Sequence, residues 1–172
     1  ALEKIVELGH QAGMKVLVDE AHGTHFYFGK NMPITAMKAG ADMASVSMHK
    51  SGGSLTQSSF LLIGENMNKG YVRQIINLTQ TTSASYLLLS SLDISRRNLA
   101  LRGEEAFDKV EYLASYARNE INRIGGYYAY GPELVNKNSV YDFDVTKLSI
   151  HTLDIGLAGI EVYDILRDEY DI

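Results

Sequence analysis

The residues of this sequence that could do chemistry gather in two short segments. The first, residues 16–22, reads VLVDEAH, and the second, residues 47–53, reads SMHKSGG. Asp19 supplies a carboxylate at the end of the first apolar run, and Lys50 supplies an amine after the second. A lysine amine forms a Schiff base with an aldehyde, and a carboxylate keeps a pyridine nitrogen protonated. Together these two groups are the minimum that an enzyme using pyridoxal phosphate (PLP) requires.

The spacing of apolar side chains predicts the elements that hold these residues. We expect strands at residues 15–19, 42–47, 58–63, 140–143 and 147–153, and helices at residues 2–13, 34–39, 67–77, 85–101, 103–124 and 158–169. The near-continuous apolar run that ends at Asp19 is typical of a strand buried on both faces. Helix and strand alternate through the first 63 residues, which predicts an α/β domain with a mostly parallel sheet. In such sheets ligands bind beyond the strand ends, where Asp19 and Lys50 lie.

The sequence changes character along its length, and this change predicts two domains. Residues 1–126 are expected to form an incomplete PLP-binding large domain, and residues 127–172 a connection and the start of a C-terminal α+β domain. The connection, Gly126 to Asn138, is rich in turn-forming residues. A helical pattern already begins at Leu2 without a capping residue before it, so we expect an internal fragment of a longer polypeptide.

Composition narrows the class of protein further. The chain has 172 residues, a net charge of −5, 45% hydrophobic residues and no cysteine. No apolar run approaches the roughly 18 to 20 residues that cross a membrane, and no signal peptide is visible, so we expect no membrane partner. No stripe of lysine and arginine is present, which argues against a nucleic-acid partner. The lack of cysteine excludes disulfides and fits a cytoplasmic location.

Five motifs resemble the bacterial ornithine/lysine/arginine decarboxylases, which are fold-type-I PLP enzymes. They are DEAHGTH at residues 19–25, SMHKSGGSLTQ at 47–57, TSASYLLLSSLD at 82–93, DVTKL at 144–148 and GIEVYDILRDEY at 159–170. The motifs extend through nearly the whole chain and occur in the family's order. The resemblance implies part of an aspartate-aminotransferase-like large domain, with most of the phosphate loop lying before residue 1.

This resemblance assigns roles to the residues around Lys50. It implies that Lys50 forms the Schiff base with PLP and that Ser47 donates a hydrogen bond to the cofactor phosphate. It places His49 next to the phosphate or the substrate, and makes Lys50 or His49 the acid that returns a proton after CO₂ leaves. Without the resemblance, a solvated surface position is the usual fate of a lysine.

The resemblance also implies cofactor contacts outside this segment. Asp19 pairs with the pyridinium nitrogen, Ala21 packs under the ring, and His22 lies beside the ring hydroxyl. Ser83 reaches the phosphate of a neighbouring subunit across a dimer interface. Simpler roles stay open, because Asp19 can cap a loop, His22 can bond to the loop backbone, and Ser83 can cap a helix.

The activity implied by the resemblance is decarboxylation of a basic amino acid in polyamine metabolism. The substrate would be arginine, lysine or ornithine, the cofactor PLP, and the assembly a homodimer or a larger homo-oligomer. We expect no metal, because His22 and His25 do not have the spacing of a helical metal pair and no third ligand is apparent.

Three alternatives use the same residues. Another fold-type-I PLP enzyme, an aminotransferase or an acyl-CoA-condensing synthase, would also need Asp19 and Lys50, because the fold does not determine the reaction. The stretch VLVDEAH also resembles the Mg²⁺-binding strand of nucleotide-driven DEAH-box helicases, but no Gly-x-x-x-x-Gly-Lys-Ser/Thr motif occurs in the sequence. A non-catalytic relative would be expected to lose Asp19 or Lys50, and both are present.

Overall fold

The structure is a computed structural model that describes residues 1–137 and 139–172. These residues group into two compact units, Ala1–Phe107 and Asp108–Ile172. The domain boundary expected near residue 126 stays a prediction, because compact packing alone does not define a domain. Asn138, the last residue of the expected connection, lies outside the described residues.

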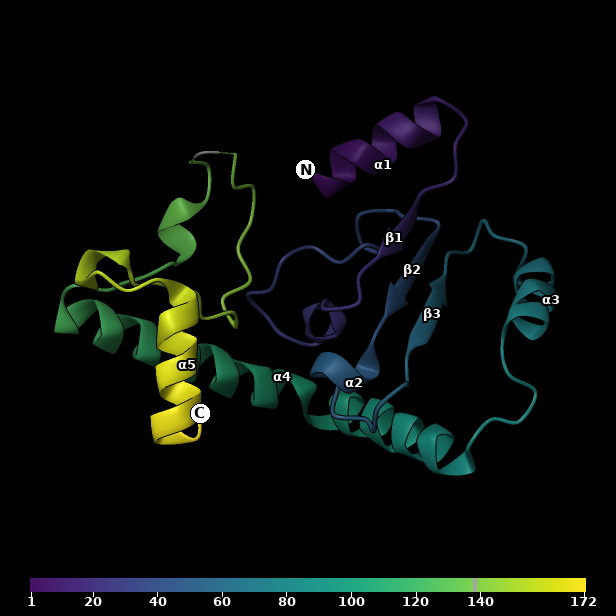
Figure 1. Ribbon diagram of the computed structural model, residues 1–172. Coiled ribbons are helices and arrows are strands. Elements are labelled where there is room, and N and C mark those ends of the chain that lie inside the picture. Colours follow the sequence, from purple (N-terminus) through teal and green to yellow (C-terminus); the bar gives the residue numbers. More distant parts are fainter. Residues whose placement is uncertain (138) are drawn as a thin grey trace. The chain divides into compact units, whose positions relative to one another are not determined.

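A three-stranded sheet forms the centre of the first unit. Figure 1 shows its strands side by side in the order β1 (Leu17–Asp19), β2 (Met43–Val46) and β3 (Phe60–Ile63). β1 and β2 are parallel, whereas β2 and β3 are antiparallel. The sheet is therefore mixed, whereas the sequence predicts a mostly parallel sheet. The connection after β2 contains only the single helical turn α2 (Met48–Ser51), which is too short for the crossover that joins parallel strands.

The helix α1 (Leu2–Gln11) packs against this sheet through its apolar face. Its Val6 is buried in a small core with three alanines, Ala36, Ala41 and Ala44. Half-buried apolar side chains pack around this core: Leu2, Val16, Val18, Met37 and Leu62. The helix ends as the sequence predicts, because Gly13 takes the left-handed φ of +72° that favours glycine.

Asp42, the residue before β2, ties α1 and β1 to the sheet. Its buried carboxylate accepts hydrogen bonds from Nζ of Lys15 at 2.9 Å and from the amide of Val16 at 2.9 Å. It also lies 2.8 Å from Nε2 of His10. The hydrogen bond from Lys15, followed by those from the Val16 amide and His10, holds the pKa of Asp42 well below its usual range.

Glu20 organises the segment between β1 and β2. Its two carboxylate oxygens accept hydrogen bonds from the Tyr27 hydroxyl at 2.6 Å and from the Ala36 amide at 2.9 Å. The helix predicted at residues 34–39 is wrong, since these residues form a turn instead. The turn ends at Gly40, whose φ of +90° is incompatible with a continuing helix.

The remaining elements of the first unit are a short 3-10 helix and two longer helices. They are η1 (Thr24–Tyr27), α3 (Lys69–Thr79) and α4 (Tyr86–Ile124), the last of which continues into the second unit. Asn68 caps α3, because its side chain accepts a hydrogen bond from the Tyr71 amide at 3.0 Å. No helix in the described part of the chain is both long and apolar enough to cross a membrane.

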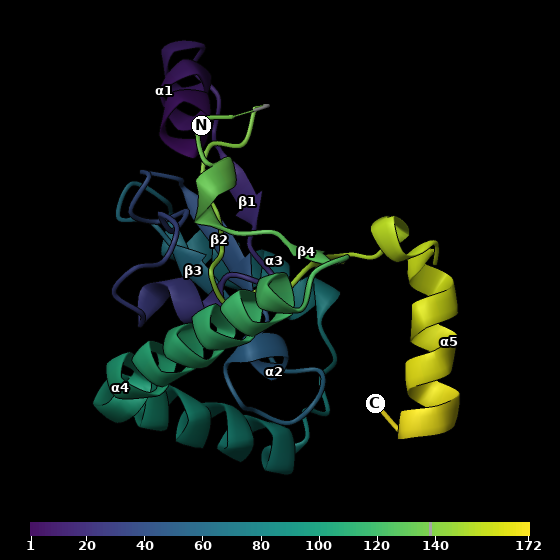
Figure 2. The same ribbon diagram turned by 90° about the vertical axis from the view of Figure 1, so that its left-hand side faces the viewer.

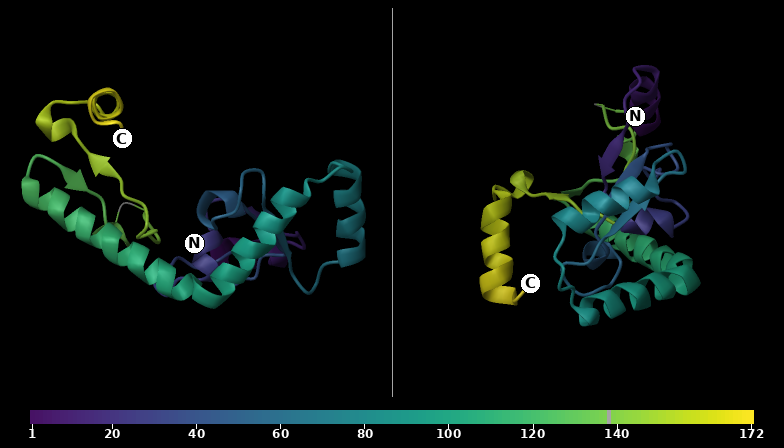
Figure 3. Two further views of the ribbon diagram at one scale, coloured as in Figure 1. Left: turned by 90° about the horizontal axis from the view of Figure 1, so that it is seen from below. Right: turned by 90° about the vertical axis from the view of Figure 1, so that its right-hand side faces the viewer.

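A single helix, α4, replaces the two helices that the sequence predicted at this place, as Figure 3 shows. Gly103, the first residue of the second predicted helix, lies inside α4 and is buried. A Cβ atom at Gly103 would lie 2.9 Å from Cβ of Phe28. This glycine therefore allows Phe28 to pack closely against the helix and does not end it.

The second unit contains a two-stranded antiparallel sheet and a closing helix. Its elements are β4 (Tyr128–Ala129), η2 (Pro132–Leu134), β5 (Ile150–His151), η3 (Leu153–Ile155) and α5 (Gly159–Tyr170), the yellow helix of Figure 2. The strand predicted at residues 140–143 is wrong, because the Val140 amide closes a turn onto the carbonyl of Lys137. Only residues 150–151 of the strand predicted at 147–153 pair with another strand.

The buried Arg118 holds the loops of the second unit to α4. Its guanidinium donates hydrogen bonds to the carbonyls of Tyr130, Val145 and Lys147 at 2.6, 3.2 and 3.0 Å. It also lies 5.5 Å from the centre of the Phe143 ring. One side chain thus joins segments that are nearly thirty residues apart in sequence.

Candidate active site

The parallel strands β1 and β2 bring the two chemically capable segments together. Asp19 is paired with Ser45, so the chain leaves both strands at the same edge of the sheet. The Glu20 amide continues this pairing with a hydrogen bond of 2.9 Å to the Ser45 carbonyl. Asp19 ends β1, and Lys50 lies in α2 directly after β2. A carboxylate and an amine therefore follow neighbouring strand ends.

Hydrogen bonds connect the loops that leave these strands. The Ser47 amide donates to the carbonyl of Ala21 at 3.3 Å, and the hydroxyl of Thr24 donates to the carbonyl of Ser47 at 3.1 Å. The Ala21 amide donates to Oδ1 of Asp19 at 3.1 Å, which closes the turn after β1. The Ser47 hydroxyl makes no capping bond to α2. Asp19, Ala21 and Ser47 thus belong to one connected cluster in which the Ser47 hydroxyl is not used for capping.

Lys50 and His22 meet at this edge of the sheet. The amine of Lys50 lies 3.3 Å from Nε2 of His22, and both side chains are exposed. His49 points to another partner, the carbonyl of Ser58, which lies 3.0 Å from its Nδ1. Of the seven residues that the sequence predicts for the site, the structure gathers six around the ends of β1 and β2.

Ser83 is the predicted site residue that does not join this cluster. It is exposed, and its amide and hydroxyl both contact the hydroxyl of Thr81, at 3.2 and 3.3 Å. It also lies three residues before the start of α4, so it does not cap that helix. The neighbouring residues Thr81 and Ala84 do line a cavity of about 300 Å³ together with Ser58.

Ser51 is a candidate that sequence reasoning missed. It follows Lys50 directly, and its hydroxyl is buried without a hydrogen-bond partner among the described residues. Buried hydroxyls in folded proteins nearly always have a partner, so this oxygen is suited to a bound ligand or water. No sequence signal marks it, because serine is common in turns of this kind.

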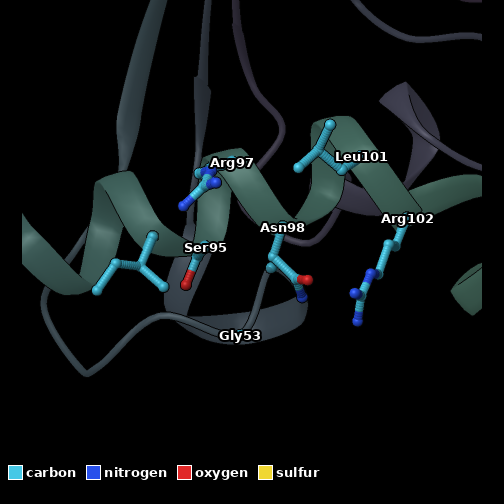
Figure 4. Close-up of a pocket in the computed structure, with 8 residues that line it drawn as sticks. Gly53, Ser95, Arg97, Asn98, Leu101 and Arg102 are labelled. Atoms are coloured by element: carbon cyan, nitrogen blue, oxygen red, sulfur yellow. The ribbon is translucent and has the colours of Figure 1, made fainter.

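A cavity of about 440 Å³ lies beside the turn that follows Lys50, and Figure 4 shows the residues of α4 on its wall. Ser95 and Asn98 point toward the Gly53 turn, and the guanidinium groups of Arg97 and Arg102 also line the cavity. The lining contains two positive side chains and no carboxylate. It is therefore unsuited to a cationic side chain. The spacing of Ser95, Asn98 and Arg102 places them on one face of α4.

Glu20 does not have the freedom that the helicase alternative requires. Both of its oxygens accept hydrogen bonds from protein groups, the Tyr27 hydroxyl and the Ala36 amide, so the carboxylate is engaged in holding the loop after β1. Burial, together with the hydrogen bond to the Glu20 carboxylate, raises the pKa of the Tyr27 hydroxyl far above its usual range. Among the residues that the structure describes, no three His, Asp or Glu side chains gather as metal ligands.

Two solved structures share the fold of this chain. The NifS-like protein from Rickettsia africae superposes with a TM-score of 0.61 over 95% of this chain and 44% of its own, at 14% sequence identity. Mouse CSAD in its apo form gives a TM-score of 0.55 over 81% of this chain and 35% of its own, at 17% identity. The expected α/β fold, that of a fold-type-I large domain, is therefore confirmed.

The chain is also similar in sequence to proteins of known name. The chain is 47% identical to the arginine decarboxylase of Halalkalibacterium halodurans and 45% identical to that of Bacillus subtilis, over 99% of this chain in both cases. It spans 35% of the length of each of these relatives. Residues 1–156 match the family described as Orn/Lys/Arg decarboxylase, major domain. Because this match takes in most of the chain, the chain belongs to the Orn/Lys/Arg decarboxylase family.

Proposed function

We propose that the full-length protein decarboxylates a basic amino acid with PLP as its cofactor. The observation that supports this most directly is the parallel register of β1 and β2, in which Asp19 is the last residue of β1 and Lys50 lies just after β2 at the same edge of the sheet. Membership of the Orn/Lys/Arg decarboxylase family supports the reaction. Since the chain spans 35% of its curated relatives, the activity is proposed for the whole protein.

The residues at this edge of the sheet fit the chemistry of PLP. Lys50 offers an exposed amine that would hold the aldehyde carbon, and Asp19 offers a carboxylate for the pyridine nitrogen. The hydroxyl of Ser47, which does not cap α2, and the buried, unpartnered hydroxyl of Ser51 offer donors for the phosphate. Ala21 has a side chain small enough to leave room for a ring. These residues thus offer a group for the aldehyde, for the ring nitrogen and for the phosphate of the cofactor.

The chain's own residues would hold the cofactor and manage the protons of the reaction. When bound, PLP supplies a protonated ring that withdraws electrons from the α-carbon of the amino acid. Asp19 would keep that ring protonated, because a carboxylate beside a pyridine nitrogen raises the proton affinity of the nitrogen. Decarboxylation consumes one proton, since the carbon that loses CO₂ gains a hydrogen. Lys50 or His49 would supply that proton.

Arginine is the first substrate to test, because the curated relatives are named arginine decarboxylases. Lysine and ornithine follow, since the family's description includes all three amino acids. A homodimer or larger assembly in the cytoplasm stays part of the proposal. In that assembly Ser83 would contact the phosphate of a neighbouring subunit.

The proposal is tested by reducing the full-length protein with borohydride in the presence of PLP and mapping the modified peptide. A pyridoxyl group on Lys50 is expected, and it should be lost in Lys50→Arg but kept in Lys38→Arg, a matched change at an exposed lysine of the same unit. Release of CO₂ from arginine, lysine or ornithine then identifies the reaction. A folded protein that forms no adduct would contradict the cofactor assignment.

The same experiment separates decarboxylation from the nearest alternative. An aminotransferase would also give the pyridoxyl adduct on Lys50, but it would convert the amino acid to a keto acid without releasing CO₂. An amine product with stoichiometric CO₂ supports the decarboxylase. A keto acid product supports the aminotransferase.

A further inference from the structure

Two neighbouring rows of side chains on α4 form one wall of the cavity beside the turn at Gly52 and Gly53. The first row contains Ser95, Asn98 and Arg102, and the second contains Ile94, Arg97 and Leu101. Residues three and four positions apart lie on the same face of a helix, so each row borders the cavity along its length. The turn lines the cavity with backbone and no side chain. The volume of about 440 Å³ lies in the range of about 300–1,000 Å³ that is usual for ligand pockets.

The two arginines of this wall have no protein partner. Within residues 1–137 and 139–172, the guanidinium groups of Arg97 and Arg102 make no ion pair and no hydrogen bond. Asp93, four residues before Arg97, pairs instead with Arg96 at 2.8 Å. Glu105, three residues after Arg102, makes no ion pair with it. The positive charge at the cavity is therefore not balanced by a carboxylate of the described chain.

Ser95 adds a buried hydroxyl to the same wall. The residue is only 7% exposed, and its side chain points toward the Gly53 turn (Figure 4). A hydroxyl inside a helix commonly bonds to the carbonyl four residues earlier, as Thr79 does in α3 with the Ile75 carbonyl at 3.0 Å. The Ser95 hydroxyl makes no such bond, nor any other with a residue that the structure describes. Because buried hydroxyls nearly always have a partner, this one is suited to a ligand in the cavity.

The charge of the cavity favours phosphate among the anions that arginine recognises. The guanidinium fork matches both carboxylate and phosphate oxygens. A phosphate monoester carries a charge of about −1.5 to −2 at pH 7, which two arginines balance, whereas a single carboxylate carries only one charge. Ile94 and Leu101 are 67% and 71% exposed beside the arginines, so they offer apolar surface to an organic part of the ligand.

We propose that this cavity binds a phosphate group at a site separate from the proposed cofactor site. Arg97 and Arg102 hold the phosphate oxygens from two sides, and the Ser95 hydroxyl and the Asn98 amide donate further hydrogen bonds. None of the residues that the sequence predicts for PLP lines the cavity. The inference goes beyond the proposed function, because it requires neither bound PLP nor decarboxylation.

Calorimetric titration of the full-length protein with glycerol 3-phosphate tests the site. The titration is done without PLP and again with saturating PLP, and we expect one site per chain with the same affinity in both. Binding that PLP abolishes would place the anion in the cofactor site and overturn the proposal, as would no binding at all. The borohydride adduct on Lys50 is a separate measurement, so failure of this inference is distinguishable from failure of the proposed decarboxylation.

Two further probes identify the ligand chemistry. Inorganic phosphate should bind more weakly than glycerol 3-phosphate, because it leaves Ile94 and Leu101 uncovered. An equal affinity would support the phosphate site and identify the free ion as its source. Acetate should bind more weakly than both, since it carries a single charge. If acetate binds as tightly as the phosphates, the assignment to phosphate is wrong.

Substitution of the arginines locates the site on α4. We expect Arg97→Gln and Arg102→Gln each to weaken binding of glycerol 3-phosphate by about tenfold or more, because a hydrogen bond to a charged group is lost. Both side chains are exposed, so the melting temperature should change little. Arg73→Gln removes an exposed arginine of α3 that does not line the cavity, and it should bind like the unchanged protein. Binding that Arg97→Gln and Arg102→Gln leave unchanged would contradict the proposal.

Ser95→Ala tests the buried donor without changing the charge of the cavity. Alanine removes only the hydroxyl, which bonds to no described residue, so we expect the fold to be kept. Affinity for glycerol 3-phosphate should fall by about tenfold, since the hydroxyl no longer donates to a charged group. Ser90→Ala is the matched change at an exposed serine of α4 outside the cavity and should leave the affinity unchanged. Equal affinity of Ser95→Ala and Ser90→Ala would show that the phosphate does not reach Ser95 and would overturn this arrangement of the site.

Discussion

The amine of Lys50 lies 3.3 Å from Nε2 of His22, a residue 28 positions earlier in the chain. The two side chains follow different strands, and the parallel register of β1 and β2 accounts for their meeting. An ammonium group only donates hydrogen bonds, so His22 accepts through an unprotonated Nε2 when Lys50 is charged. The imidazole of His22 is thus directed at the amine that we propose to hold the cofactor.

Replacing His22 by phenylalanine should weaken the site without unfolding it. Phenylalanine keeps a planar ring of similar size but removes the nitrogen that faces Lys50. Hydrogen bonds to charged groups are worth about 1.5–3 kcal/mol, so we expect kcat/KM for the amino acid to fall by about tenfold or more. His151→Phe in the second unit is the matched control and should leave kcat/KM unchanged. Equal rates in all three proteins would show that the His22–Lys50 contact is incidental.

Replacing Asp19 by asparagine separates its charge from its place in the turn. Asparagine keeps an oxygen that accepts from the Ala21 amide, so the turn after β1 should survive. It removes the negative charge that we propose for the pyridine nitrogen. We expect an unchanged fold by circular dichroism, with kcat at least about tenfold lower, since a charged hydrogen bond of about 1.5–3 kcal/mol is lost. If this variant keeps full activity, then Asp19 only closes the turn after β1 and does not contact the cofactor.

The contacts of Asp42 predict a pH-dependent attachment of α1. Lys15 and the Val16 amide lower the pKa of Asp42 in the folded state, so ionisation of Asp42 favours folding. This stabilisation is complete above the unfolded-state pKa of about 3.9 and is lost as the pH falls through the lower folded-state value. The protection factors of the α1 amides in the full-length protein, in which the intrinsic pH dependence of hydrogen exchange is divided out, should therefore fall at acidic pH.

Asp42→Asn provides the test of this pH dependence. The variant should raise α1 exchange at neutral pH by the equivalent of about 1–3 kcal/mol, because a buried charged partner is removed. It should also show a weaker response to acid than the unchanged protein. Asp93→Asn removes an exposed carboxylate paired with Arg96 and should change exchange by about 0.5 kcal/mol or less. If the exchange of α1 responds to acid equally in Asp42→Asn and in the unchanged protein, then another titratable group causes the pH dependence.

The sequence predicted the strand ends that carry Asp19 and Lys50, because a run of apolar residues that stops at polar ones is a local pattern. It did not predict the role of Gly103, which depends on the approach of Phe28 from a distant segment. The hydrogen bond between the His49 ring and the Ser58 carbonyl could not be predicted from the sequence either, since it depends on how the intervening turn folds. Local periodicity is visible in one sequence, whereas contacts across turns and between segments are not.

Arg118 should be irreplaceable by lysine in the second unit. Its planar guanidinium donates to four carbonyls from one position, those of Ala114, Tyr130, Val145 and Lys147, and an ammonium on a flexible stem does not reproduce this geometry. We expect Arg118→Lys to destabilise the loops around β4 and β5 by about 2–4 kcal/mol, from the loss of one or two charged hydrogen bonds. Hydrogen exchange of those peptides in the full-length protein measures the effect. Arg123→Lys, at an exposed arginine paired with Glu120, should have little effect, and an equal effect of both variants would contradict this prediction.

The two glycines after Lys50 should respond differently to alanine. A Cβ atom at Gly52 would lie 2.8 Å from the carbonyl oxygen of Met48, a backbone atom of α2 that cannot move without displacing Lys50. At Gly53 nothing lies within 4 Å of such a Cβ, but the φ of +84° is strained for any other residue. Gly53→Ala should therefore cost about 1–2 kcal/mol of stability through backbone strain alone. Gly52→Ala should in addition move the amine that we propose to hold the cofactor.

The difference between these glycines is measurable as cofactor affinity. Absorbance titration of the full-length variants with PLP should show an affinity at least about tenfold lower for Gly52→Ala, because a small misplacement of a reacting group has a large effect. Gly53→Ala should bind PLP nearly as well as the unchanged protein, despite its lower stability. Melting temperatures measured without cofactor supply the control for folding. If Gly53→Ala lost more affinity than Gly52→Ala, then close packing against Met48 would not be what positions Lys50.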